Sequence, residues 1–95
     1  VNIGIGIAVD EGLLVPVIRN ADQLSLAGVA RALDDLARRS RAGTLTLEDV
    51  QGGTFTITNP GVFGSIWSMP IIVPGQAAIL ATDAIVRRAV VRDDA

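Results

Sequence analysis

The sequence contains no cysteine, no histidine, no lysine and no tyrosine, and it has only three aromatic residues. Without cysteine the chain forms no disulfide and no thiolate metal site, and the lack of histidine also argues against zinc. The same absences exclude Ser-His-Asp and Cys-His catalysis by residues of this chain alone. We therefore expect no metal site here and no imidazole base within these residues.

Charged residues are also scarce. They make up 19% of the 95 residues, the formal net charge is −2, and the isoelectric point is near 4.8. This balance gives no reason to expect nucleic acid or an anionic membrane surface as a partner. The first residues, VNIGIGIAVD, have no basic leader and no clear cleavage site, so no signal peptide is predicted. With no cysteine and no predicted signal peptide, we expect a cytoplasmic protein. We also expect the chain to be cut from a longer one, because it begins within a predicted strand.

Aliphatic residues are abundant instead. Hydrophobic residues account for 49% of the chain, and the mean hydropathy is +0.48. A chain of this length buries a smaller share of its surface than a larger domain does. The composition therefore predicts that aliphatic surface is covered by the rest of a larger domain or by other subunits.

One long stretch, residues 50–82, contains no charged residue at all. Its length would allow a membrane span, but Pro60, Pro70, Pro74 and several glycines break any helix there. Irregular backbone cannot face lipid, so we expect this stretch to be buried against protein.

The first third of the chain predicts strands. Residues 2–9 alternate, with isoleucine and valine on one face and Asn2, Gly4, Gly6 and Ala8 on the other. The small face implies that another backbone or a ligand approaches closely. A turn is predicted at 10–12, followed by a second strand at 13–18 that Pro16 makes an edge or irregular strand.

The clearest helix follows and ends near Gly43, which sits where a C′ glycine would. Ser25 is the expected N-cap, with Asp22 as a rival. The predicted apolar stripe consists of Leu26, Val29, Leu33 and Leu36, widened by Ala30 and Ala37. Later elements are a capped turn at 46–49, a strand at 54–58, a turn at 59–61, irregular chain at 65–76, and apolar strands at 77–86 and 89–91. This order indicates an α+β fold with a mixed sheet and one main amphipathic helix.

Read from the residues alone, three groups are candidates for chemistry, and each also has an ordinary structural interpretation. The arginines at 38, 39 and 41 form either an anion site or a solvated helix face, and the i,i+4 pairs with Asp34 and Asp35 favour the second. The adjacent carboxylates of Asp10 and Glu11 are most simply two solvated charges in a turn. The hydroxyl face of Thr54, Thr56 and Thr58 reflects either strand propensity or a site.

Several segments together resemble a known family. They are GLLVPVI at 12–18, the helix start Leu24-Ser25-Leu26, the Gly43-x-Leu45 step, GGTFTITN at 52–59, and Pro-x-x-x-Pro-x-Gln-x-Ala-Ile at 70–79. In this order and spacing they resemble the catalytic domain of dihydrolipoamide acyltransferases of 2-oxo acid dehydrogenase complexes, which has a chloramphenicol acetyltransferase-like fold. The resemblance covers nearly the whole chain. It implies that residues 1–95 are part of that domain, without its N-terminal part and without its His-x-x-x-Asp-Gly region.

The resemblance also implies a chemistry. Such enzymes transfer an acyl group between dihydrolipoamide and coenzyme A, with a histidine as general base and a hydroxyl as hydrogen-bond donor to the oxyanion. The hydroxyl closing the Phe-Thr-x-(Ser/Thr)-Asn pattern is Thr58, the expected catalytic residue, and Asn59 is expected to fix the turn behind it. The base is expected downstream of Asp94, so the chain alone should be inactive. Asp83, where the family often has a small residue, is expected to form a structural hydrogen bond.

The resemblance further implies coenzyme A and lipoamide as substrates, the lipoyl group being carried on a separate domain. It implies a trimer-based homo-oligomer with decarboxylase and dihydrolipoamide dehydrogenase components as partners. The alternative is a non-catalytic scaffold or a truncated remnant. Asn59-Pro60-Gly61 and Pro74-Gly75-Gln76 are similar to the acyltransferase-like domain of fused oxoglutarate decarboxylases.

Overall fold

The computed structural model describes residues 1–10 and 12–94, with only the backbone of Val62. The strands are β1 (Ile3–Ile5), β2 (Ile7–Val9), β3 (Gly12–Leu14), β4 (Val17–Ile18), β5 (Phe55–Thr58) and β6 (Ile79–Ala81). One α-helix, α1 (Leu26–Ala42), is accompanied by 3-10 turns at Ala21–Gln23, Glu48–Val50 and Pro60–Phe63. The predicted turn at 10–12 includes Glu11, which lies outside the described residues.

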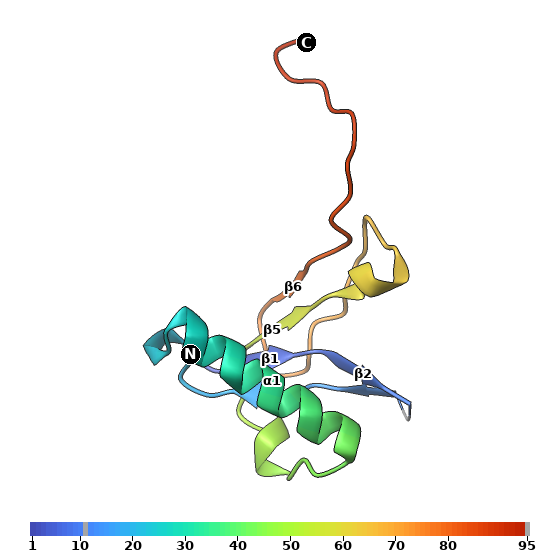
Figure 1. Ribbon diagram of the computed structural model, residues 1–95. Coiled ribbons are helices and arrows are strands. Elements are labelled where there is room, and N and C mark those ends of the chain that lie inside the picture. The colour runs from blue at the N-terminus through green and yellow to red at the C-terminus, as the bar shows by residue number, and fades with distance from the viewer. Residues whose placement is uncertain (11, 95) are drawn as a thin grey trace.

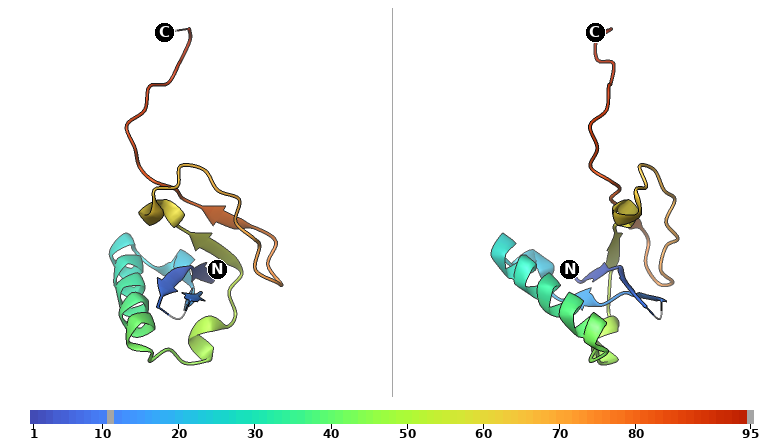
Figure 2. Two further views of the ribbon diagram at one scale, coloured as in Figure 1. Left: turned by 90° about the vertical axis from the view of Figure 1, so that its right-hand side faces the viewer. Right: turned by 45° about the vertical axis from the view of Figure 1, so that its right-hand side comes forward.

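The main sheet has four strands in the order β4-β1-β5-β6. β1 pairs antiparallel with β4 and parallel with β5, and β5 pairs parallel with β6. A separate antiparallel hairpin joins β2 and β3. Helix α1 crosses one side of the strands and contacts β2 and β4, as Figures 1 and 2 show. The predicted α+β class, mixed sheet and single main helix are confirmed.

The predicted strand at 2–9 is two short strands in two sheets. Gly6 lies at the break, and its N–H donates to the Ile57 carbonyl at 3.0 Å, beyond the end of β1. Pro16 similarly separates β3 from β4, as its missing N–H predicts. Its carbonyl still accepts from Ile5 N–H at 2.9 Å, so the main sheet continues past the break.

Helix α1 begins and ends where its capping residues predict. The Ser25 hydroxyl accepts from Gly28 N–H at 3.0 Å, and Gly43 adopts the left-handed conformation, with φ of 70°. Ser25 is thus the N-cap, and Asp22 lies in the preceding 3-10 turn.

The predicted apolar stripe of α1 is only partly correct. Leu36 is buried and Val29 half-buried, but Leu26 is 88% exposed and Leu33 is also exposed. The helix face against the strands instead runs through Val29, Ala32, Leu36 and Ser40. The Ser40 hydroxyl donates to the Leu36 carbonyl at 2.7 Å, which satisfies it within the helix. The strands are too short to cover the whole apolar side of a 17-residue helix.

Apolar surface is exposed along most of the uncharged stretch. The buried hydrophobic core consists of Val17, Ile18 and Leu36, whereas Trp67 is 75% exposed and Ile71 is 89% exposed. The expected burial of residues 50–82 is therefore not achieved by the described residues of one chain. Among these residues, no helix is long and apolar enough to cross a membrane.

The strand predictions beyond Ala81 are wrong. Of the range 77–86 only Ile79–Ala81 pairs, and residues 89–91 have no regular structure. After Ala84, whose N–H still donates to the Ser65 carbonyl, the described chain runs away from the sheet as a tail, red in Figure 1, and the molecule measures 52 × 31 × 28 Å. Aliphatic side chains favour a strand only where a partner edge is present, and no described strand lies beside this tail.

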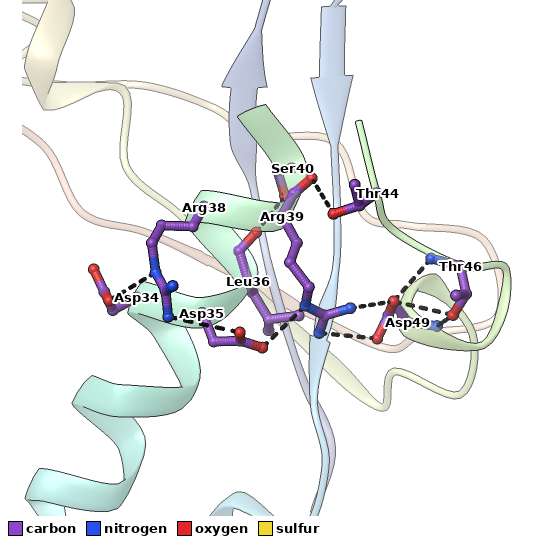
Figure 3. Close-up of polar contacts among 9 residues, drawn as sticks. All are labelled: Asp34, Asp35, Leu36, Arg38, Arg39, Ser40, Thr44, Thr46 and Asp49. Carbon is purple, nitrogen blue, oxygen red and sulfur yellow. Dashed lines mark hydrogen bonds and ion pairs between the residues drawn. The ribbon is translucent and has the colours of Figure 1, made fainter. Parts of the chain in front are cut away.

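Arg39 connects the end of α1 to the following turn (Figure 3). Its guanidinium donates to Asp35 at 3.0 Å and to both carboxylate oxygens of Asp49, at 2.6 and 3.2 Å. Asp49 also accepts from Thr46 N–H at 2.8 Å, while the Thr46 hydroxyl accepts from Asp49 N–H at 3.3 Å. This is the capped turn predicted at 46–49, with aspartate in the position usually held by Glu or Gln.

We predict that this ion pair makes stability depend on pH. Hydrogen bonds from Arg39, and then from Thr46 N–H, lower the pKa of Asp49 from 3.8 to about 2. Because the folded pKa lies below the unfolded one, the contribution is complete well above pH 3.8 and is lost as pH falls through about 2. Asp49→Asn should therefore reduce the difference in urea midpoint between about pH 7 and about pH 3.

Asp34→Asn is the matched control, because it removes an exposed i,i+4 pair with Arg38 and should change the midpoint much less. An unchanged pH dependence in Asp49→Asn would show that the Arg39–Asp49 pair does not contribute to folding.

The exposed apolar side chains predict self-association of the isolated chain. Sedimentation velocity should detect species heavier than the 9.9 kDa monomer. Replacing Ile66, Trp67 and Ile71 by serine should shift the population toward the monomer. A monodisperse monomer of the unsubstituted chain would contradict the prediction.

Candidate functional site

The three threonines expected on one face of the central strand differ in what their hydroxyls contact. Thr54 donates to the Asn2 carbonyl at 3.0 Å, and Thr56 donates to Gln76 Oε1 at 2.7 Å. The Thr58 hydroxyl has no hydrogen-bond partner among residues 1–10 and 12–94. Two of these hydroxyls are therefore committed to structure, while the third is left for a ligand or solvent.

The glycines of the first strands provide the space for these hydroxyls. A Cβ on Gly4 would lie 3.0 Å from Thr56 Oγ1, and a Cβ on Gly6 would lie 3.0 Å from Thr58 Oγ1. Both glycines thus face β5, which pairs with β1 in parallel. The predicted close approach on the glycine face is real, but the groups that approach most closely are side chains, rather than a backbone or a ligand.

A cavity of about 350 Å³ opens beside Thr58. Its lining is almost entirely apolar and comes from three parts of the chain: Gly6, Leu13 and Val15; Thr56, Thr58 and Pro60; and Ser68, Met69, Pro70, Ile71, Val73 and Ile79. Of its three hydroxyls, Ser68 donates to Asp83 Oδ1 at 3.1 Å and Thr56 donates to Gln76. The cavity therefore combines apolar walls with the uncommitted donor of Thr58, an arrangement typical of small-molecule sites.

Thr58 also borders a second hollow of about 490 Å³ on the side of α1. Leu33, Ala37 and Arg41 of the helix line this hollow, together with Asn59 and Phe63. Gly6, Leu13, Thr58 and Pro60 line both hollows. Thr58 thus stands where two hollows with different walls meet.

The turn after Thr58 is fixed by hydrogen bonds. Asn59 Oδ1 accepts from Gly61 N–H at 2.9 Å, and the Thr58 carbonyl accepts from Thr82 N–H at 2.9 Å. A Cβ on Gly61 would lie 2.7 Å from Ala84 N, so only glycine fits there. The carboxylate of Asp83 is bonded to Ser68, consistent with the structural role expected for it.

The arginine cluster does not form an open anion site in this chain. Arg38 pairs with Asp34 at 3.2 Å, and Arg39 is held by two aspartates. The solvated-face interpretation therefore describes Arg38, whereas Arg39 is half-buried and connects α1 to the following turn. Arg41 differs, because it lines the hollow beside α1. Among the residues that the structure describes, no group of three or more His, Cys, Asp or Glu side chains could hold a metal ion.

The sequence reasoning missed Ser68 and Met69, which line the cavity beside Thr58, and Gln76, which accepts a hydrogen bond from Thr56. Their segment was expected to be irregular and is irregular, so no periodicity marked their faces. A signal was nevertheless present for Gln76. Thr56 lies in the interior of a strand, and a buried hydroxyl requires a partner that a nearby amide can provide.

Comparison with known proteins gives a consistent result. The chain matches, over residues 1–95, the family described as 2-oxoacid dehydrogenases acyltransferase (catalytic domain). It is 50% identical over 94 residues to the lipoamide acyltransferase component of the branched-chain alpha-keto acid dehydrogenase complex of Bacillus subtilis. It is 52% identical over 93 residues to the succinyltransferase component of the 2-oxoglutarate dehydrogenase complex of Bartonella vinsonii subsp. berkhoffii. These matches cover 99% and 98% of this chain but only 22% and 23% of the relatives.

Solved structures agree with the sequence comparison. A probable dihydrolipoamide acetyltransferase from Listeria monocytogenes superposes with a TM-score of 0.92 at 49% identity, covering 100% of this chain and 41% of that one. The dihydrolipoamide acetyltransferase of Azotobacter vinelandii superposes with a TM-score of 0.90 at 38% identity, covering 95% and 37%. These neighbours confirm the predicted chloramphenicol acetyltransferase-like fold.

Proposed function

Because the chain belongs to the family of 2-oxoacid dehydrogenase acyltransferase catalytic domains, we propose that it provides the oxyanion-binding part of a dihydrolipoamide acyltransferase. The complete enzyme would transfer an acyl group between dihydrolipoamide and coenzyme A. The observation that carries the proposal is the Thr58 hydroxyl, which ends a central strand, faces an apolar cavity and has no partner among the described residues.

The proposed step places this hydroxyl at the reacting carbonyl. A thiolate attacks the thioester carbon, and the carbonyl oxygen takes on negative charge in a tetrahedral intermediate. Thr58 donates a hydrogen bond to that oxygen, and the apolar walls strengthen the interaction because they exclude water. The intermediate collapses when the thiolate that originally carried the acyl group leaves and is protonated. Each direction of transfer uses the same donor.

The base for this step has to come from outside the chain, which contains no histidine. The Azotobacter vinelandii enzyme was studied for the role of a serine, a histidine and an asparagine in its catalytic mechanism. We assign the hydroxyl role here to Thr58 and the imidazole role to a residue that these 95 residues do not include. The isolated chain is accordingly expected to be inactive.

Two thiol substrates need two approaches to one acyl group. The two hollows that meet at Thr58 offer such approaches. The apolar cavity suits an acyl chain and an uncharged lipoyl arm, while Arg41 places a positive charge on the other side, where coenzyme A carries phosphates. We propose these two sides as the entrances for dihydrolipoamide and coenzyme A respectively.

Assembly follows from the exposed apolar surface. A neighbour with a TM-score of 0.90 at 38% identity forms the cubic core of the pyruvate dehydrogenase multienzyme complex. We propose that the protein containing this chain likewise forms a trimer-based homo-oligomer that works with decarboxylase and dihydrolipoamide dehydrogenase components. The residues around Trp67 and Ile71 would then be covered by other parts of the assembly.

A second candidate function is a non-catalytic scaffold. It requires only the fold and the exposed apolar contact surface. The two functions differ in whether this chain supports turnover when a base is supplied. A chimaeric enzyme tests this directly: the chain replaces the matched segment of the Bacillus subtilis lipoamide acyltransferase, to which it is 50% identical.

We predict that Thr58→Ala lowers kcat of this chimaeric enzyme by about a hundredfold or more, because the oxyanion loses its donor. The KM for acyl-coenzyme A should change little, since the interaction is made mainly in the transition state. Thr58→Ser should retain most of the activity. Steady-state kinetics with dihydrolipoamide and acyl-coenzyme A compares both variants with the unsubstituted chimaera.

Thr54→Ser and Thr54→Ala are the matched controls, because Thr54 directly precedes β5 and its hydroxyl is bonded to Asn2. They should affect folding stability more than kcat. If Thr58→Ala retained the full kcat, Thr58 would have no role in the mechanism. A folded but inactive chimaera with Thr58 intact would support the scaffold function.

A further inference from the structure

Gln76 is joined to the middle of β5 by a hydrogen bond that connects two separate parts of the cavity wall. The Thr56 hydroxyl donates to Gln76 Oε1 at 2.7 Å, although the two residues are 20 positions apart. Thr56 is only 1% exposed, so its hydroxyl cannot turn to water for a substitute. A buried hydroxyl that loses its protein partner is left unsatisfied, which makes this bond a specific constraint.

The surroundings of the bond leave its two partners little freedom. On the strand side, a Cβ on Gly4 would lie 3.0 Å from Thr56 Oγ1. On the other side, a Cβ on Gly53 would lie 3.0 Å from Gln76 Nε2. Glycine at positions 4 and 53 therefore allows the hydroxyl and the amide to meet between β1 and β5. The contact is partly buried, with Thr56 buried and Gln76 half-buried.

The segment held by Gln76 forms half of the cavity beside Thr58. Ser68, Met69, Pro70, Ile71 and Val73 line that cavity, yet residues 65–78 contain no helix or strand. Few hydrogen bonds hold this segment: Ala84 N–H to the Ser65 carbonyl at 2.7 Å, Gln76 N–H to the Val73 carbonyl at 3.0 Å, and the Ser68 and Gln76 side-chain bonds. Figures 1 and 2 show it in yellow and orange, returning toward the start of β6.

We propose that Gln76 is a positioning residue for acyl transfer, an inference that rests on the proposed role of Thr58. Its Oε1, by accepting from Thr56, holds the irregular wall against the strand two residues before Thr58. The wall then keeps the acyl group beside the Thr58 hydroxyl and keeps water away from it. Gln76 touches neither substrate nor the reacting atoms, and it acts through the Thr56 bond.

Isosteric variants separate the hydrogen bond from simple packing. Gln76→Met keeps the length of the side chain but removes the acceptor, whereas Gln76→Glu keeps an oxygen that can accept from Thr56. In the chimaeric enzyme, Gln76→Met should lower kcat/KM for dihydrolipoamide by about ten- to a hundredfold, the effect of a misplaced wall on alignment. Gln76→Glu should restore most of that loss.

The strand side of the bond provides an independent pair of variants. Thr56→Val, which lacks the hydroxyl, should reproduce the loss of Gln76→Met, and Thr56→Ser should not. The double variant Gln76→Met with Thr56→Val should be no slower than either single variant, because both remove one interaction. Thermal unfolding of every variant shows whether the loss in rate exceeds any change in the folded fraction.

The outcomes distinguish this inference from the proposed function. If Thr58→Ala retains the full kcat, the proposed function is wrong. If Thr58→Ala loses kcat but Gln76→Met retains its kcat/KM for dihydrolipoamide, only the positioning role is wrong. Equal losses in Gln76→Met and Gln76→Glu, or losses that multiply in the double variant, also overturn it. If both Gln76→Met and Thr56→Val fail to fold, the bond serves stability and the positioning role is wrong.

Discussion

The pairing of β5 on both of its edges is the constraint on which the site depends. β1 binds one edge and β6 the other, both in parallel register, so the strand cannot slip without losing both ladders. A slip by one residue would turn every threonine to the opposite face. The register thus fixes the position of Thr58. Gly4 and Gly6, in the adjacent segment of the same chain, leave space for the hydroxyls of Thr56 and Thr58. The turn bonded by Asn59 then ends the strand immediately behind Thr58.

The rest of the molecule covers its apolar side chains less fully than the strands around β5 do. Its buried hydrophobic core is small, one side of α1 is uncovered, and the uncharged residues after β5 expose large aliphatic and aromatic side chains. The chain covers 22% of the Bacillus subtilis relative and 23% of the Bartonella vinsonii relative. It covers 41% of the solved Listeria monocytogenes chain. Exposed apolar surface next to an apolar cavity is consistent with a site that is finished by further protein, as the proposed assembly requires.

Features that depend on neighbouring residues were predictable from the sequence. The caps of α1 at Ser25 and Gly43, and the reciprocal Thr46–Asp49 turn, follow from local hydrogen bonding and backbone conformation. Features that depend on distant partners were not. The predicted strand at 89–91 is wrong because these residues pair with no strand that the structure describes, and Leu26 and Leu33 are uncovered because the strands are short. The Thr56–Gln76 bond joins residues that no sequence period relates.

A liganded crystal structure of the chimaeric enzyme would show whether the Thr58 hydroxyl binds the oxyanion. The ligand is a coenzyme A analogue whose acyl carbonyl is replaced by a tetrahedral centre carrying a negatively charged oxygen. Thr58 Oγ1 should lie about 2.7–3.1 Å from that oxygen, the range for an oxyanion donor. An analogue oxygen held by another donor, with the Thr58 hydroxyl pointing elsewhere, would show that Thr58 is not the oxyanion donor.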